Sequence, residues 1–121
     1  MKSECTIDGD GTKYWWFNDR LHRVDGPAVE WFDGNKYWCI NGKLHRVDGP
    51  AAEYANGDKS WCINGKLHRE DGPAVEYANG NKHWYINGEE LTFKQWLSAV
   101  WDTLPKEKQK KYAFNGFEYE E

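Results

Sequence analysis

Several features are scarce or missing in this 121-residue chain, and each absence excludes a class of protein. No run of 18 apolar residues occurs, so the sequence predicts no membrane-spanning helix. The first four residues do not begin a signal peptide, and we therefore expect a cytoplasmic protein. Only three cysteines are present, Cys5, Cys39 and Cys62. We expect reduced thiols, because Cys39 and Cys62 fall on equivalent strands about 10 Å apart, which is too far for a disulfide.

The signatures of catalysis are also missing. The chain contains no nucleophile elbow, no phosphate-binding loop and no HExxH pattern. His, Arg and Asp do recur together, but they are displayed three times along a surface instead of converging in one pocket. Each copy offers one His and one Asp, which is too few for a tetrahedral metal site. We therefore expect no catalytic residue, no metal and no cofactor, and a protein that is not an enzyme.

The dominant positive feature is a 23-residue repeat. A shift of 23 residues superposes a set of glycines, a set of tryptophans and three Leu-His-Arg triplets. These are Gly11, Gly34, Gly57 and Gly80; Trp15, Trp38, Trp61 and Trp84; and residues 21–23, 44–46 and 67–69. A fixed period in this range indicates a stacked array, in which each unit buries its apolar face against its neighbours.

The turn residues predict that each unit is a β-hairpin. Asn-Gly or Asp-Gly occurs twice in most units, and both residues tolerate the positive φ of a two-residue type I′ turn. With such a turn at Asp33-Gly34, Trp31 pairs with Lys36 and Val29 pairs with Trp38. Because strand side chains alternate, this register puts the Trp ladder on one face, with lysine stems lying over it, and Tyr37 on the other.

The two predicted faces differ in how strongly they repeat. The Trp-ladder face barely changes from unit to unit, which indicates that its side chains pack against one another in the fold. The opposite face varies between units and carries large side chains. We expect a partner to bind the varying face. The candidates there are Tyr14, Trp16, Phe32, Tyr37, His83 and Tyr85. A base-stacking platform is the alternative for the aromatic ladder, but the net charge is −4 and no basic groove follows the aromatics, so we expect no nucleic-acid partner.

The triplet Arg-x-Asp recurs in each connection between hairpins. It predicts a local clasp, in which the guanidinium group pairs with a carboxylate or a backbone carbonyl. The pairs are Arg23 with Asp25, Arg46 with Asp48 and Arg69 with Asp71. The functional alternative is an anion-binding row of three arginine side chains.

The periodicity changes after residue 88. Apolar residues from Phe93 to Leu104 follow the stripe of an amphipathic helix, and Thr92 with Gln95 fits a capping box. We expect a helix over about 93–103, then a basic helical turn over 106–111, and a degenerate strand over 112–116. The helix either caps the array or docks a partner through Trp101.

The octapeptide Leu-His-Arg-x-Asp-Gly-Pro-Ala at 21–28, 44–51 and 67–74 resembles MORN-related repeats of uncharacterised bacteriophage and giant-virus proteins. The resemblance covers about residues 6–88. It implies a mainly β fold, an antiparallel β-hairpin meander of about 3.5 units, here capped by a C-terminal amphipathic helix. We expect one domain over 1–121, with repeats at 6–88 and a helical cap and tail at 89–121.

The resemblance also implies a function. We expect a non-enzymatic module that binds a protein, in its concrete form a phage-encoded inhibitor of a host defence protein such as a CRISPR–Cas effector, acting in the host cytosol. The alternative is a structural or lipid-contacting MORN-like scaffold. A membrane-surface binder would carry a basic face, and here only 106–111 is basic, so we expect no membrane partner. Self-association remains open.

Overall fold

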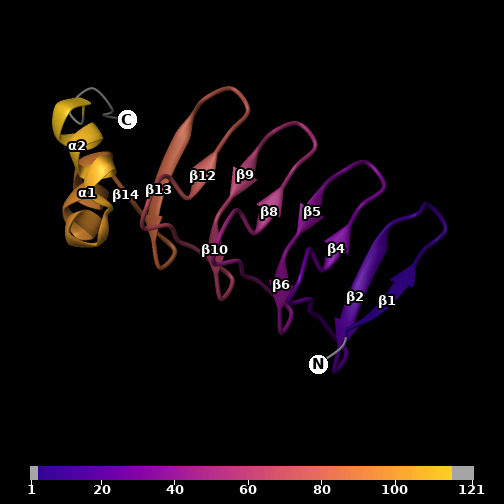
Figure 1. The fold of residues 1–121 in the computed structure, drawn as a ribbon. Helices are drawn as coiled ribbons and strands as arrows, with labels where there is room; N and C mark the ends of the chain where they lie inside the picture. Colours follow the sequence, from indigo (N-terminus) through magenta and orange to yellow (C-terminus); the bar gives the residue numbers. More distant parts are fainter. Residues whose placement is uncertain (1–2, 116–121) are drawn as a thin grey trace.

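The computed structural model describes residues 3–115, which form an elongated β array with two helices at its C-terminal end (Figure 1). The array is mainly β, as the repeat predicted, and consists of antiparallel hairpins. Its first part comprises β1 (Glu4–Ile7), β2 (Lys13–Phe17), β3 (Arg20–Leu21), β4 (Val29–Glu30), β5 (Lys36–Tyr37), β6 (Cys39–Ile40) and β7 (Lys43–Leu44). Its second part comprises β8 (Ala52–Glu53), β9 (Lys59–Ser60), β10 (Cys62–Ile63), β11 (Lys66–Leu67), β12 (Val75–Glu76), β13 (Lys82–Ile86) and β14 (Glu89–Leu91).

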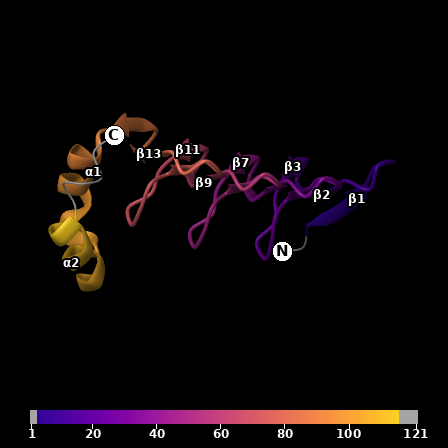
Figure 2. The ribbon, with the colours of Figure 1, turned by 90° about the horizontal axis from the view of Figure 1, so that it is seen from above.

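The strands form one long meander and a row of short hairpins beside it (Figure 2). The order in the long sheet is β1-β2-β4-β5-β8-β9-β12-β13-β14, with β3 paired to β2. The short hairpins β6–β7 and β10–β11 lie where the strand bends after Trp38 and Trp61. Every pair is antiparallel, and the same register recurs after each 23 residues: Tyr37 faces Ala52, and Ser60 faces Val75.

The two classes of Asn/Asp-Gly turn have different geometries. At Asn41-Gly42 both residues have positive φ, 52° and 81°, which is the two-residue type I′ turn. At Asp33-Gly34 only Gly34 does, with φ 100°, and the loop has three residues. The Gly34 N–H donates to the Trp31 carbonyl at 3.0 Å, and the Trp31 N–H donates to the Asn35 carbonyl at 2.9 Å. The two-residue turn predicted at this position is therefore wrong.

The longer loop moves the hairpin register by one residue. Val29 pairs with Tyr37, not with Trp38 as predicted, and the Ala28 N–H also donates to the Tyr37 carbonyl at 2.7 Å. Two consecutive residues thus oppose one, which is a β-bulge that turns both side chains inward. As a result Trp31 and Tyr37, predicted on opposite faces, pack edge-to-face with ring centroids 4.7 Å apart.

The bulge builds a core of small residues along the array. Its buried members are Ala28, Val29, Cys39, Ala51, Ala52, Cys62, Ala74 and Val75. Cys39 and Cys62 are buried free thiols within this row. Burial is the main reason that the pKa of the Cys39 thiol rises to about 11.

The C-terminal segment caps the last unit. Its elements are α1 (Phe93–Val100), a 3₁₀ turn (Trp101–Thr103) and α2 (Lys106–Asn115). Thr92 and Gln95 form the predicted capping box, with reciprocal bonds of 3.1 and 3.0 Å. Phe93 and Trp96 pack on Trp84 with centroids 4.8 and 4.5 Å away, and all three side chains are buried.

The strand predicted over 112–116 is wrong for residues 112–115, which are helical. Residues 112–115 continue α2, and Tyr112 packs on Phe93 with ring centroids 5.5 Å apart. Tyr112 belongs to the cap core, the cluster of buried side chains formed by Trp84, Phe93, Trp96, Val100, Leu104 and Tyr112. Gly116 lies outside the described residues. Over residues 3–115, no helix is long and apolar enough to cross a membrane.

Candidate binding surface

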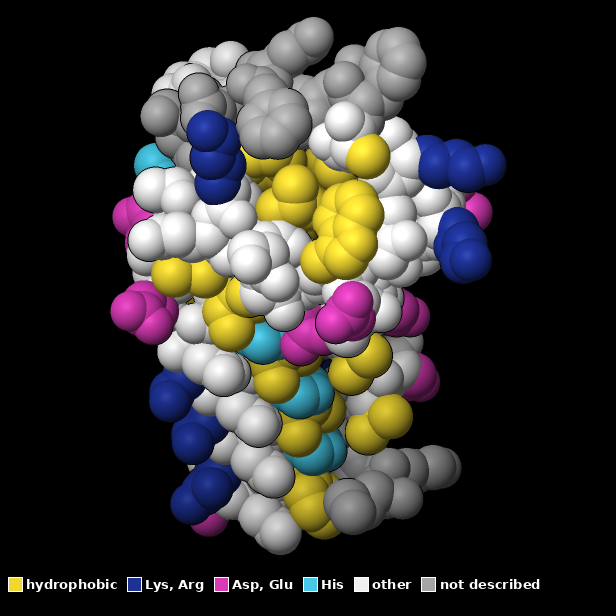
Figure 3. Space-filling view, turned by 90° about the vertical axis from the view of Figure 1, so that its left-hand side faces the viewer, with side chains coloured by type: hydrophobic (Ala, Val, Ile, Leu, Met, Phe, Trp, Pro, Cys, Tyr) yellow, Lys and Arg dark blue, Asp and Glu magenta, His cyan; other side chains and the backbone are white. Residues whose placement is uncertain are grey.

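The recurring histidines join each unit to the next. The Nδ1 atom of His45 accepts a hydrogen bond from the Asn64 N–H at 3.0 Å, which satisfies a backbone donor of the type I′ turn one unit later. The equivalent bonds join His22 to Asn41 and His68 to Asn87, at 3.0 and 2.9 Å. Only an unprotonated Nδ1 can accept such a bond. Figure 3 shows histidine side chains following one another along this face, interleaved with apolar side chains.

The arginines form the predicted clasps. Arg46 Nε donates to Asp48 at 3.3 Å, and its Nη1 donates to the Pro50 carbonyl at 3.1 Å and to Glu53 at 3.3 Å. The same set recurs at Arg23 and Arg69. Each guanidinium group therefore faces two carboxylates, so an anion-binding row of unengaged arginine side chains is not what the structure presents.

The guanidinium groups also cover the Trp ladder. The Arg46 Cζ lies 3.8 Å from the centre of the Trp38 ring, within cation–π range. The corresponding distances are 3.9 Å for Arg23 over Trp15 and 3.7 Å for Arg69 over Trp61. The predicted lysine stems are not the groups over these rings: Lys36 and Lys59 are exposed along the hairpin strands. The arginine of the connection that follows each short hairpin lies over the Trp ring of the same unit instead.

The glycine after each Arg-x-Asp makes room for the clasp. A Cβ placed on Gly49 would lie 2.8 Å from the Arg46 Cζ, closer than real Cβ atoms approach any neighbour. Gly26 and Gly72 stand in the same relation to Arg23 and Arg69. Gly49 does not have a positive φ, so close approach, and not backbone conformation, accounts for glycine here.

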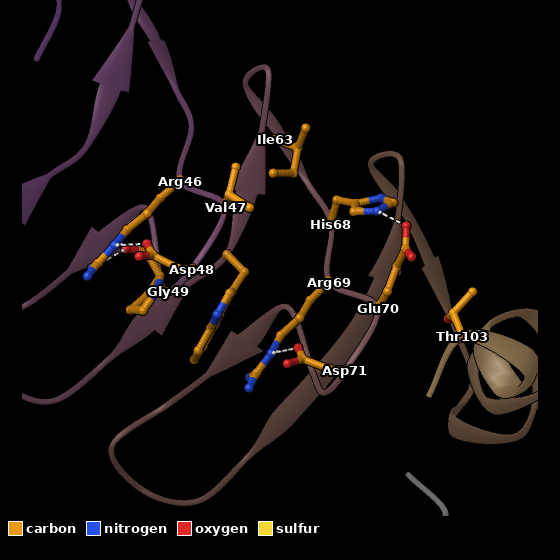
Figure 4. Close-up of a pocket in the computed structure, with 12 residues that line it drawn as sticks. Arg46, Val47, Asp48, Gly49, Ile63, His68, Arg69, Glu70, Asp71 and Thr103 are labelled. Carbon is orange, nitrogen blue, oxygen red and sulfur yellow. Dashed lines mark hydrogen bonds and ion pairs between the residues drawn. The ribbon is translucent and has the colours of Figure 1, made fainter. Parts of the chain in front are cut away.

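Two grooves lie between successive connections. The first groove, of about 750 Å³, is bounded by residues 23–27, by Trp38 and Ile40, and by 45–48. The second groove, of about 720 Å³, is bounded by 46–50, by Trp61 and Ile63, and by 68–71, with Thr103 at its end. Every lining residue of the first groove has its counterpart 23 residues later in the second. Figure 4 shows the Arg46–Asp48 and Arg69–Asp71 pairs on neighbouring connections of the second groove, with Val47 and Ile63 in its lining.

The third copy of the groove is covered by the chain's own C-terminal segment. Arg69, 71–73 and Trp84 occupy the positions equivalent to Arg46, 48–50 and Trp61, but here α2 adds Lys108, Lys111 and Tyr112. The remaining cavity is about 220 Å³. Trp96 Nε1 donates to the Arg69 carbonyl at 2.8 Å, and Lys108 Nζ donates to the Asp71 carbonyl.

The predicted partner-binding residues do not converge. Tyr14 and Trp16 stack on each other at the N-terminal end with ring centroids 6.0 Å apart, and Trp16 Nε1 donates to Thr6. Phe32 is 68% exposed in a hairpin loop. At the other end His83 Nδ1 lies 2.7 Å from Glu90 Oε2.

The remaining predicted residues are partly buried. The Tyr37 hydroxyl lies 3.1 Å from that of Tyr54, and this contact is the main reason that the pKa of Tyr54 rises to about 12. Tyr85 lies near Glu90, and Trp101 packs against the cap core. The grooves contain none of the seven.

The residues that sequence reasoning missed are Val24 and Val47, which are 75% and 82% exposed and line the grooves. Their signal is an apolar side chain at the variable position of Arg-x-Asp, between two charged residues. Over residues 3–115, no group of three His, Cys, Asp or Glu side chains could hold a metal ion. Comparison with known proteins yields no matching family model and no match among curated proteins.

Proposed function

We propose that this protein is a non-enzymatic module that binds another protein. The observation that carries the proposal is the pair of open grooves between the Arg-x-Asp connections, whose third copy is filled by a helix of the same chain. The wall that packs a protein segment at one position, Arg-x-Asp-Gly-Pro beside a Trp, recurs at two others. Exposed apolar side chains in such grooves are typical of protein interfaces.

The use of the recurring polar residues supports a binding role over a catalytic one. His45 accepts a backbone hydrogen bond from the next unit, and Arg46 is held by a carbonyl, two carboxylates and the Trp38 ring. These side chains hold the array together. A nucleophile or general base is instead expected to point at a reacting atom in a pocket.

A capture experiment tests this proposal. The chain is immobilised, incubated with bacterial lysate and compared with a variant that carries Val24→Lys and Val47→Lys, which should fold normally because both side chains are largely exposed. We expect a protein that the unmodified chain retains in stoichiometric amount and the double variant loses. Capture of no protein above a blank matrix would contradict the binding role. Equal capture by the unmodified chain and the double variant would support protein binding but would show that the grooves are not the binding site.

The finer form of the proposal is inhibition of a bacterial defence protein, such as a CRISPR–Cas effector, and it rests on the resemblance of the Leu-His-Arg-x-Asp-Gly-Pro-Ala octapeptides to phage-borne repeats. Expression of the chain in cells with active CRISPR–Cas immunity should restore plating of a targeted phage. Unchanged plating would contradict this form. The scaffold alternative predicts that the chain floats with anionic lipid vesicles, and we expect it to remain unbound.

A further inference from the structure

The covered groove shares one wall with the open grooves, but the C-terminal segment stands where each open groove has a second Arg-x-Asp connection. The covered groove has the same Arg-x-Asp-Gly-Pro wall and the same Trp floor, and α2 closes it with two lysines and a tyrosine. One lysine of α2, Lys108, donates to the carbonyl of Asp71. Asp48 and Asp25 are the equivalents of Asp71 in the open grooves.

The charge of the open grooves favours a basic occupant. Each clasp sets one guanidinium group against two carboxylates, as Arg46 does with Asp48 and Glu53. Asp25 and Asp48 remain 86% and 88% exposed, so they are available to a second cation. Glu70, which replaces the valine of the earlier copies, adds a further carboxylate to the second groove.

The apolar part of each groove favours an amphipathic occupant. Val47 lines both grooves and is 82% exposed, and Trp61 and Ile63 in the second groove are only partly buried. In the covered copy the corresponding apolar surface meets Tyr112, Phe93 and Trp96, and Trp84 becomes buried. In the open copies Arg46 and Arg69 lie over the Trp38 and Trp61 rings instead, so the apolar side chains that an occupant can meet there are Val47 and the isoleucine of each groove, Ile40 or Ile63.

We infer that the grooves at Trp38 and Trp61 each bind a basic amphipathic helix of a protein partner, with its apolar side chains toward Val47 and the groove's isoleucine and its lysines beside the Arg-x-Asp carboxylates. The inference rests on the proposed protein-binding function and specifies its ligand.

A labelled peptide tests the inference directly. The probe is a synthetic peptide with the sequence of residues 92–113, which carries the aromatic stripe and the lysines of the C-terminal segment, and its binding to the full chain is followed by fluorescence anisotropy. We expect saturable binding that weakens with added salt, as an attraction between exposed charges should. A second peptide with Lys108→Glu and Lys111→Glu should bind at least tenfold more weakly.

A matched pair of protein variants locates the site. Val47→Lys places a cation in both grooves and should weaken binding at least tenfold. Phe32→Lys makes a similar change at an exposed position of the same repeat, outside the grooves, and should leave binding unchanged.

Three outcomes would overturn the inference. No binding at millimolar protein would show that the grooves do not take such a helix. Loss of binding with Phe32→Lys but not Val47→Lys would place the site on the hairpin loops. Binding that Val47→Lys leaves intact and Trp84→Ala alters would show exchange with the chain's own cap, as in a domain-swapped dimer. In each case the capture experiment still decides separately whether the chain binds a protein at all.

Discussion

The clasp around Gly49 offers the sharpest test of how the repeat is stabilised. The substitution Gly49→Ala adds one methyl group whose carbon would lie 2.8 Å from the Arg46 Cζ. The guanidinium group would then have to leave its place between Trp38, Pro50 and Glu53. The Gly49 backbone does not have a positive φ, so alanine itself is compatible with the local conformation.

The magnitude follows from the contacts that Arg46 would give up. A partly buried cation–π contact contributes about 1 kcal/mol. A hydrogen bond from a charged donor to a backbone carbonyl contributes about 1.5 kcal/mol. The ion pair with Asp48 contributes close to nothing, since Asp48 is 88% exposed, and the pair with Glu53 contributes about 0.5 kcal/mol. Arg46→Ala should therefore lower the free energy of unfolding by about 3 kcal/mol, and Gly49→Ala by about 2 kcal/mol.

A double-mutant cycle separates this cause from a general effect of alanine. Without the arginine, Gly49→Ala should cost nothing and should stabilise by about 0.5 kcal/mol, because alanine restricts the unfolded chain. Urea denaturation of the four proteins provides the measurement. Equal destabilisation by Gly49→Ala in both backgrounds would refute the explanation given for this glycine.

Four further substitutions and one pH titration test the rest of the fold. Trp84→Ala should lower the free energy of unfolding by about 3–5 kcal/mol in chemical denaturation, because its ring is buried under Phe93 and Trp96. Trp61→Ala should lower it by about 1–3 kcal/mol, because the Trp61 ring is only half-buried. The reverse order would contradict the assigned role of the cap. His45→Ala should cost about 1–2 kcal/mol by leaving the Asn64 N–H without its acceptor, and an unchanged urea midpoint would show that water replaces it. The buried Cys39 thiol has its pKa raised from 9.0 to about 11, so the unfolded chain ionises first and stability should fall as pH rises from 9 to 11. Cys39→Ala should lessen that fall, and an identical pH profile in the variant would rule out this thiol as a cause.

The sequence alone is enough to predict the 23-residue period, the β-hairpins, the Arg-x-Asp clasp and the helical cap. These features depend on contacts within about one unit, such as Thr92 with Gln95 or Arg46 with Asp48, and on a strong amphipathic stripe. Their local chemistry agrees with the final structure, which is why the pattern predicts them correctly.

The hairpin register depends on longer-range contacts. Asp33-Gly34 suits both a two-residue type I′ turn and a three-residue loop that ends in a glycine with positive φ. The three-residue loop is favoured by contacts between units: Asn35 Oδ1 accepts from the Ala55 N–H at 2.7 Å, and Asp58 Oδ1 does the same for Ala78. Because these bonds span 20 residues, no local signal distinguishes the two turns.

The side chains of the predicted varying face are arranged differently for the same reason. A one-residue change of register moves side chains between faces, so Tyr37 turned out to pack with Trp31 and Tyr54. The connection between hairpins also varies from unit to unit. Val24, Val47 and Glu70 occupy the variable site of the connection, and the structure places them in the grooves.

The most direct test of the binding surface is the indole region of a ¹H–¹⁵N NMR spectrum during titration with the peptide of residues 92–113. Each of the eight tryptophans carries one indole N–H, and single Trp→Phe variants assign their signals. We predict that the signals of Trp38 and Trp61 shift in proportion to the bound fraction, while that of Trp31 stays unchanged. Shifts confined to Trp31, or to Trp84 and Trp96, would contradict the assignment of the grooves as the binding surface.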